Sequence, residues 1–123
     1  MKIEVSKGEI VDKFTILVIK KKNIKDSAKL DLLEKELNHL KPSYLLIWQE
    51  LKSEELTAQL FEVNSKLWDV EDKLRELEHA RDFGDTFIEN ARSVYTLNDE
   101  RARIKRKINE LTQSALTEVK SYE

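Results

Sequence analysis

The sequence predicts an all-α fold, and three observations lead to that prediction. The chain has 2 Gly and 1 Pro in 123 residues, whereas folds built from many turns and strands need far more of both. Hydrophobic residues make up 40% and charged residues 37%, a composition typical of long helices with one solvated face. Apolar residues also recur at helical spacings along most of the chain. The length is that of one domain, so we expect residues 1–123 to form a single helical domain.

The first helix is predicted over residues 7–24. Ser6 and Glu9 are spaced as a capping box, in which the Ser hydroxyl accepts a hydrogen bond from the third helical amide. The β-branched run at residues 14–19 is also compatible with a strand, because short apolar runs are ambiguous by periodicity alone. The capping box favours the helix.

The second helix is predicted to be short, over residues 28–40. Asp26 or Ser27 is suited to cap it, and leucines at positions 30, 33, 37 and 40 form one apolar stripe. Pro42 disfavours helical geometry at the residue before it. We therefore expect the chain to break there and a third helix to begin near residue 44.

The rest of the chain is predicted to form a long antiparallel hairpin of helices at about residues 44–80 and 86–119. The first of these carries a heptad seam, typical of coiled coils: Leu60, Val63, Leu67, Val70, Leu74 and Leu77. The second carries its own seam: Val94, Leu97, Arg101, Ile104, Ile108, Leu111 and Ala115. Between them, Gly84 is expected to stop one helix, and Thr86 with Glu89 matches a second capping box. The two shorter N-terminal helices are expected to pack on this hairpin.

Charge is unevenly distributed along the chain, although the net charge is only −2. Residues 1–41 hold 10 Lys/Arg and 7 Asp/Glu, residues 42–100 hold 6 and 14, and residues 101–123 hold 6 and 3. An acidic middle between basic ends suggests that the ends dock on the middle, within one chain or between two. Chance variation among solvated helix faces is an equal alternative.

Several classes of protein are disfavoured by composition. The chain has no Cys, which excludes disulfides and a Cys-type zinc site. The N-terminal segment lacks a signal-peptide core, and no apolar run approaches the ~20 residues of a membrane span. We expect a cytoplasmic protein without membrane insertion.

Five of the seven residues from Arg101 to Lys107 are basic, which raises the question of a nucleic-acid interface. At helical spacing these side chains spread around the helix, whereas a DNA-reading helix arrays them along one face. We therefore expect no nucleic-acid partner. An anion site within the bundle and an ordinary solvated helix face are the other two interpretations.

A candidate ligand site follows from pairing the two hairpin helices about their turn. Arg92 then lies level with Glu71 and Asp72, and Arg101 lies level with Val63 and Asn64. The candidate ligand-binding residues are Arg92, Arg101, Glu71, Asp72, Asn98, Asp99, Trp68 and Lys13. Arg side chains can hold a phosphate or carboxylate with two parallel hydrogen bonds. The favoured alternative is a network of interhelical salt bridges that fixes the register of the helices.

No motif in the sequence defines a reaction. Glu71 and Asp72 would need carboxylates from a facing helix to hold Mg²⁺, and that helix offers Arg92 and Asp99 instead. We expect no metal and no cofactor, and the sequence leaves open whether the protein is an enzyme and which residues would be catalytic.

Three separated motifs resemble an uncharacterised family of small helical proteins from bacteria and their viruses. They are VSKGEIVDKFTIL, LWDVEDKLRELE and FIENARSVYTLNDERARIKRKIN, and the resemblance covers nearly the whole chain. It implies no established activity. The family-like polar positions are Glu9, Asp12, Lys13, Glu71, Asp72, Arg75, Arg92, Asn98, Asp99, Arg101 and Arg106.

The function expected from the sequence is that of a helical interaction, assembly or accessory protein. The exposed length of the two seams predicts a homodimer, with a different protein as another potential partner. The alternative is a protein or enzyme that binds an anionic small molecule, with a phosphate or carboxylate held by the Arg/carboxylate site between the hairpin helices.

Overall fold

The computed structural model describes residues 4–112, which form four helices. These are α1 (Lys7–Asn23), α2 (Ser27–Leu51), α3 (Glu55–His79) and α4 (Asp85–Leu111). The predicted all-α class is confirmed, and residues 14–19 are helical. The expected extension of the last helix to residue 119, including Ala115 of its seam, lies outside the described residues.

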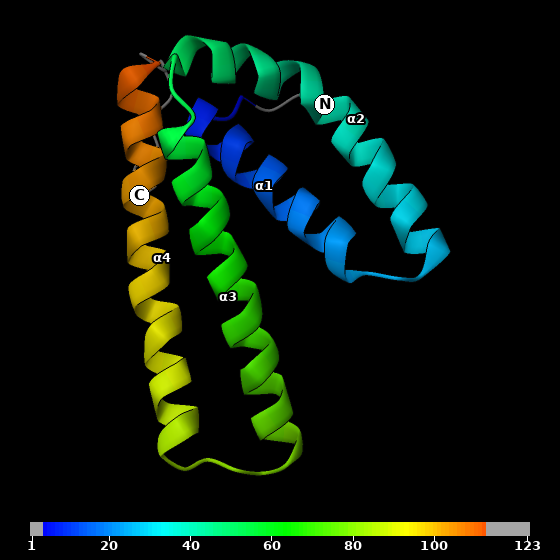
Figure 1. The fold of residues 1–123 in the computed structure, drawn as a ribbon, viewed down its shortest axis with the longest axis vertical. Helices are drawn as coiled ribbons and strands as arrows, with labels where there is room; N and C mark the ends of the chain where they lie inside the picture. The colour runs from blue at the N-terminus through cyan, green and yellow to red at the C-terminus, as the bar shows by residue number, and fades with distance from the viewer. Residues whose placement is uncertain (1–3, 113–123) are drawn as a thin grey trace.

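The four helices form two antiparallel hairpins that meet at one end and diverge at the other (Figure 1). We call the hairpin of α1 and α2 the α1–α2 arm, and that of α3 and α4 the α3–α4 arm. Helix α1 packs against α2, α3 and α4 and so holds the two arms together. The turns of the two arms lie far from this junction, at the two open ends of a V (Figure 1).

The main hydrophobic core lies at the junction of the arms. All four helices contribute to it: Val11, Ile47, Leu51, Leu60, Val63, Leu67, Ile104 and Ile108. A smaller cluster, centred on Leu17, Leu33 and Leu37, joins α1 to α2. Half of the predicted seam of α3, namely Leu60, Val63 and Leu67, is therefore buried at the junction, while among residues 4–112 the outer part of the α3–α4 arm consists of its own two helices.

The boundary between the second and third helices differs from the prediction. Pro42 lies within α2 rather than before a new helix, and the chain breaks ten residues later, where Lys52 adopts a left-handed φ of 56°. Residues 44–51 therefore belong to α2. A proline inside a helix removes one hydrogen bond and bends the axis without ending the helix. Helix α2 is bent along its length (Figure 1), and its second half brings Ile47 and Leu51 into the main core.

Two of the three predicted helix caps form. The Ser6 hydroxyl accepts a hydrogen bond from the Glu9 amide at 3.2 Å, and the Asp26 carboxylate accepts from the amides of residues 28 and 29. The third cap, between Thr86 and Glu89, does not form, because α4 begins one residue earlier than expected and Gly84 occupies its N-cap position.

The turn between α3 and α4 also stops the helix in an unexpected way. Arg81, not Gly84, takes the left-handed conformation, with a φ of 55°. Its amide donates to the Glu78 carbonyl, and the Asp82 amide donates to the Leu77 carbonyl. These two bonds define a Schellman motif, which usually has glycine at the left-handed position. The glycine signal therefore located the turn but not the residue that ends the helix.

Candidate functional site: a buried carboxylate and an adjoining pocket

A buried carboxylate joins three helices near the junction of the arms. Asp12 of α1 is 1% exposed. Arg101 of α4 donates from Nε to Asp12 Oδ1 at 2.8 Å and from Nη2 to the other oxygen. Asn64 of α3 donates to Asp12 Oδ1 at 3.0 Å and to the Thr15 hydroxyl at 2.8 Å. A carboxylate this buried requires such partners, since an unpaired charge in the interior is costly.

A second basic side chain extends this polar cluster along α4. Lys105, one turn beyond Arg101, is 6% exposed and places its Nζ 2.8 Å from a Glu9 oxygen and 3.8 Å from an Asp12 oxygen. The basic segment at residues 101–107 is therefore split. Arg101 and Lys105 point into the protein and hold α1, whereas Arg103, Arg106 and Lys107 are exposed.

The close approach of α1 to α4 depends on a glycine. The Gly8 amide donates to Asn109 Oδ1 at 2.7 Å, and a Cβ at Gly8 would lie 2.5 Å from the Lys105 carbonyl oxygen. The Asn109 Nδ2 is buried and has no hydrogen-bond partner among residues 4–112. Because its Oδ1 accepts the hydrogen bond from the Gly8 amide, Asn109 acts as a buried acceptor for the start of α1.

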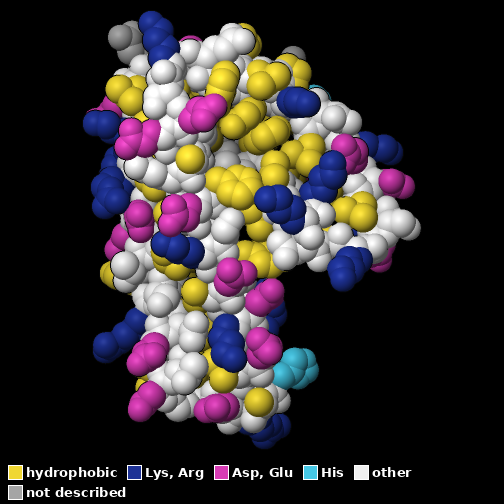
Figure 2. Space-filling view, in the orientation of Figure 1, with side chains coloured by type: hydrophobic (Ala, Val, Ile, Leu, Met, Phe, Trp, Pro, Cys, Tyr) yellow, Lys and Arg dark blue, Asp and Glu magenta, His cyan; other side chains and the backbone are white. Residues whose placement is uncertain are grey.

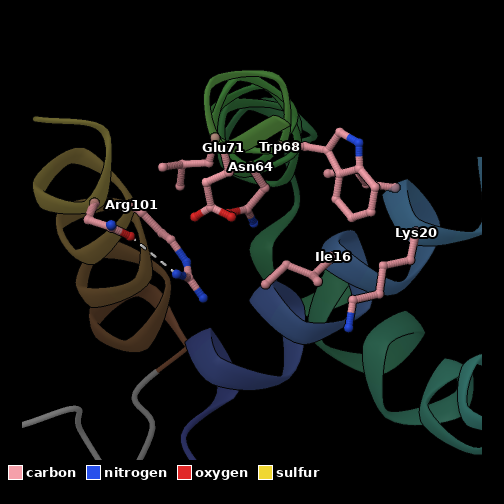
Figure 3. A pocket seen from close by; sticks show the side chains of 9 residues that line it. Ile16, Lys20, Asn64, Trp68, Glu71 and Arg101 are labelled. Carbon is pink, nitrogen blue, oxygen red and sulfur yellow. Dashed lines mark hydrogen bonds between the residues drawn. The ribbon is translucent and has the colours of Figure 1, made fainter. Parts of the chain in front are cut away.

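A pocket of about 200 Å³ adjoins the buried carboxylate, between α1, α3 and α4 (Figure 3). Its walls combine charged, amide, aromatic and aliphatic side chains: Ile16, Ile19, Lys20, Asn64, Leu67, Trp68, Glu71, Asn98 and Arg101. Arg101 lies between the two features. Two of its nitrogens bind Asp12, and its Nη1 donates to Asn98 Oδ1 at 3.3 Å.

Four of the eight predicted site residues line this pocket, namely Trp68, Glu71, Asn98 and Arg101. The expected pairing of Arg101 with Asn64 across the hairpin is also seen, because both contact Asp12. The heptad seams and the antiparallel turn were therefore sufficient to place α3 against α4 in approximately the right register.

The other four predicted residues are exposed and lie apart from the pocket lining: Arg92, Asp72, Asp99 and Lys13. Asp72 forms a surface ion pair with Arg75 at 2.8 Å. Lys13 is directed toward α2, where its Nζ lies 3.9 Å from a Glu36 oxygen. The hairpin register alone could not place Lys13, because that requires knowing which face of α1 packs on the α3–α4 arm.

Sequence reasoning missed Asp12 as the centre of the cluster, Lys105 as part of the cluster, and Lys20 as part of the pocket lining. Asp12 appeared only among the family-like polar positions. One signal was available: Asp12 and Thr15 fall on the face of the first helix that also carries Val11, Ile16 and Ile19. Polar residues on an apolar face suggest a buried polar network, and an acidic residue there calls for a basic partner.

The exposure of Arg92 leads to a first prediction. Arg92→Ala should change the free energy of unfolding by less than about 0.5 kcal/mol, because an exposed residue without an ion pair contributes little. Within residues 4–112, Arg92 forms no side-chain hydrogen bond or ion pair, so the change strands no carboxylate there. Urea denaturation would measure it, and a loss of 1 kcal/mol or more would contradict this placement.

These features define a class: a small all-α protein of two diverging hairpins, held together by a buried polar cluster with a pocket beside it. The chain belongs to a family of unknown function, DUF6165, whose sequence model matches residues 1–123. No curated protein matches the chain, and no solved structure matches it. In the part of the chain that the structure describes, no helix is long and apolar enough to cross a membrane. Residues 4–112 also contain no group of three His, Asp or Glu side chains placed to hold a metal ion.

Proposed function

We propose that this protein is a helical assembly protein that pairs with a second copy of itself through the open ends of its two arms. The observation that carries the proposal is the opposite charge of these two ends. It rests on the exposed residues around the two interhelical turns.

The open end of the α1–α2 arm is basic. Residues 21–29, which we call the basic end, hold four Lys and one Asp. The open end of the α3–α4 arm is acidic: residues 72–89, the acidic end, hold six Asp/Glu and three Lys/Arg. Figure 2 shows acidic side chains outnumbering basic ones on the visible face of the outer α3–α4 arm. Because the arms diverge, the two ends of one chain are held apart by the fold (Figure 1).

A two-fold axis relating two copies would pair both charged ends of each copy at once. If the basic end of one copy lies on the acidic end of the other, symmetry repeats the same contact in the opposite direction. Pairing the basic end with a second basic end, or the acidic end with a second acidic end, would instead bring like charges together, which is unfavourable. The charge pattern thus favours one mutual orientation of the two copies.

Exposed apolar side chains lie within or beside these charged ends. Leu32 of α2 is 63% exposed and follows the basic end. Phe83 and Ile88 are 52% and 49% exposed in the acidic end, and Tyr95, further along α4, is 74% exposed. Large apolar and aromatic residues at the centre of a polar rim are typical of protein interfaces. They support the pairing of the ends independently of charge.

The alternative, a site for a simple anion, has less support from the geometry. It relied on Arg92 and Arg101 acting together on one phosphate or carboxylate. Arg92 lies on the surface apart from the pocket, and the charge of Arg101 is directed at Asp12. An incoming anion would have to compete with a carboxylate that is already in place.

Charge reversal tests the proposed assembly. We expect Lys25→Glu with Lys29→Glu to weaken self-association about tenfold or more, and Glu76→Lys with Glu78→Lys to do the same. Combining all four changes should restore association, because the charges become complementary again. Light scattering across a range of protein concentrations would give the mass of each variant. Wild-type association should also weaken between about 0.05 and 0.5 M salt.

The matched control is Arg103→Glu with Lys107→Glu, which reverses two exposed charges of α4 outside both ends. It should associate like the wild type. A wild-type protein that stays monomeric at all concentrations would rule out self-association. If neither single-arm charge reversal changes the dissociation constant of the dimer, the interface lies elsewhere.

A further inference from the structure

The pocket between α1, α3 and α4 contains two side chains of opposite charge that no other side chain of residues 4–112 pairs with. Lys20 of α1 and Glu71 of α3 both line it. Neither side chain forms a hydrogen bond or ion pair with another residue of the described range 4–112. Figure 3 shows the two on different sides of the pocket, extending from different helices.

The remaining charge in the wall is already balanced. Arg101 is neutralised by Asp12, which binds it with both carboxylate oxygens. With Arg101 balanced, Lys20 and Glu71 bring the sum of charges around the pocket to zero. A ligand with only a negative charge would be repelled by the Glu71 carboxylate, and a ligand with only a positive charge would be repelled by the Lys20 ammonium. A ligand carrying both charges would satisfy both side chains and leave neither opposed.

The rest of the lining suits a small aliphatic body. Ile16, Ile19 and Leu67 supply apolar surface, and Trp68 supplies an aromatic ring beside Lys20 (Figure 3). The volume of about 200 Å³ is below the range of about 300–1,000 Å³ typical of drug-sized ligands, which points to a smaller molecule. The side-chain amide of Asn98 adds a neutral hydrogen-bonding group at the rim.

We propose that this pocket binds a small zwitterion of the size and chemistry of an aliphatic amino acid. Its ammonium group would lie against the Glu71 carboxylate, its carboxylate against the Lys20 ammonium, and its aliphatic part against Trp68 and Ile16. The site lies within one chain, so it does not depend on self-association.

Tryptophan fluorescence provides a direct test. The chain has two Trp, so Trp48→Phe leaves Trp68, in the pocket wall, as the reporter. The probes are L-leucine, 6-aminohexanoate, and the singly charged analogues isoamylamine and 4-methylpentanoate. We expect at least one zwitterion to saturate with a dissociation constant of about 1 mM, the affinity open to so small a ligand. Both singly charged analogues should bind at least about tenfold more weakly.

Variants of the two charged residues separate this site from non-specific binding. Glu71→Gln and Lys20→Gln should each weaken zwitterion binding about tenfold or more, since each leaves one ligand charge unpaired in the pocket. Lys73→Gln and Glu76→Gln are matched controls on α3 outside the lining, and both should bind like the parent. The proposal is overturned if neither zwitterion gives a saturating change in Trp68 fluorescence at concentrations up to about 50 mM. Binding of one singly charged analogue as tightly as the zwitterion also overturns it.

Discussion

Arg101→Leu is expected to lower the free energy of unfolding by about 3–5 kcal/mol, because it leaves a carboxylate buried without its cation. Asp12 is 1% exposed and cannot turn toward water. Lys105 remains 3.8 Å from Asp12, but its shorter contact, at 2.8 Å, is with Glu9. Urea denaturation at one fixed protein concentration would measure the loss.

The reverse change should cost less. Asp12→Ala removes a carboxylate partner of Arg101, but the Arg101 side chain is 27% exposed and can be hydrated, and its Nη1 still donates to Asn98 Oδ1. We expect a loss of about 2–3 kcal/mol for this variant. The double variant should lose less than the sum of the two single losses, since no charge of the pair is left stranded.

The surface pair of Asp72 and Arg75 provides the control for this experiment. It has a similar distance, 2.8 Å, but both side chains are more than half exposed. Asp72→Ala should therefore cost less than about 1 kcal/mol. Equal losses for Asp72→Ala and Asp12→Ala would show that burial does not set the strength of the Asp12 cluster.

Gly8→Ala is expected to lower the free energy of unfolding by about 2–3 kcal/mol, even though alanine is a better helix former by about 0.5–1 kcal/mol. The new Cβ would lie 2.5 Å from the Lys105 carbonyl oxygen, which belongs to the backbone of α4 and cannot rotate away. To relieve this contact α1 and α4 must separate. That movement would lengthen the 2.7 Å hydrogen bond between the Gly8 amide and Asn109.

Gly84→Ala is the matched control, because it adds the same methyl group at the other glycine of the chain. Its nearest neighbour would be an Asp82 side-chain oxygen at 3.4 Å, an ordinary contact, and its φ of −78° is open to alanine. We expect a change of less than about 1 kcal/mol. Thermal unfolding of both variants would measure the difference. A Gly8→Ala protein as stable as Gly84→Ala would mean that the two helices are not held in close contact at Gly8.

The sequence by itself determined the helical class, the first helix and the hairpin of the last two helices. These follow from local and periodic information: the Ser6 cap, the paucity of glycine and proline, and seams such as the one through Leu60, Val63 and Leu67. Side chains spaced by three and four on two helices joined by a short turn have few ways to pack. The same constraint placed Arg101 opposite Asn64.

The tertiary structure alone decided where the second helix ends and what the polar residues do. Pro42 can either end a helix or bend it, and the burial of Ile47 and Leu51 in the main core decides for the bend. Asp12 and Arg101 are separated by 89 positions, so their contact depends on how α1 crosses the α3–α4 arm. That crossing is set by packing at the junction and by the absence of a side chain at Gly8. Neither of these produces a periodic pattern in the sequence from which the crossing could be predicted.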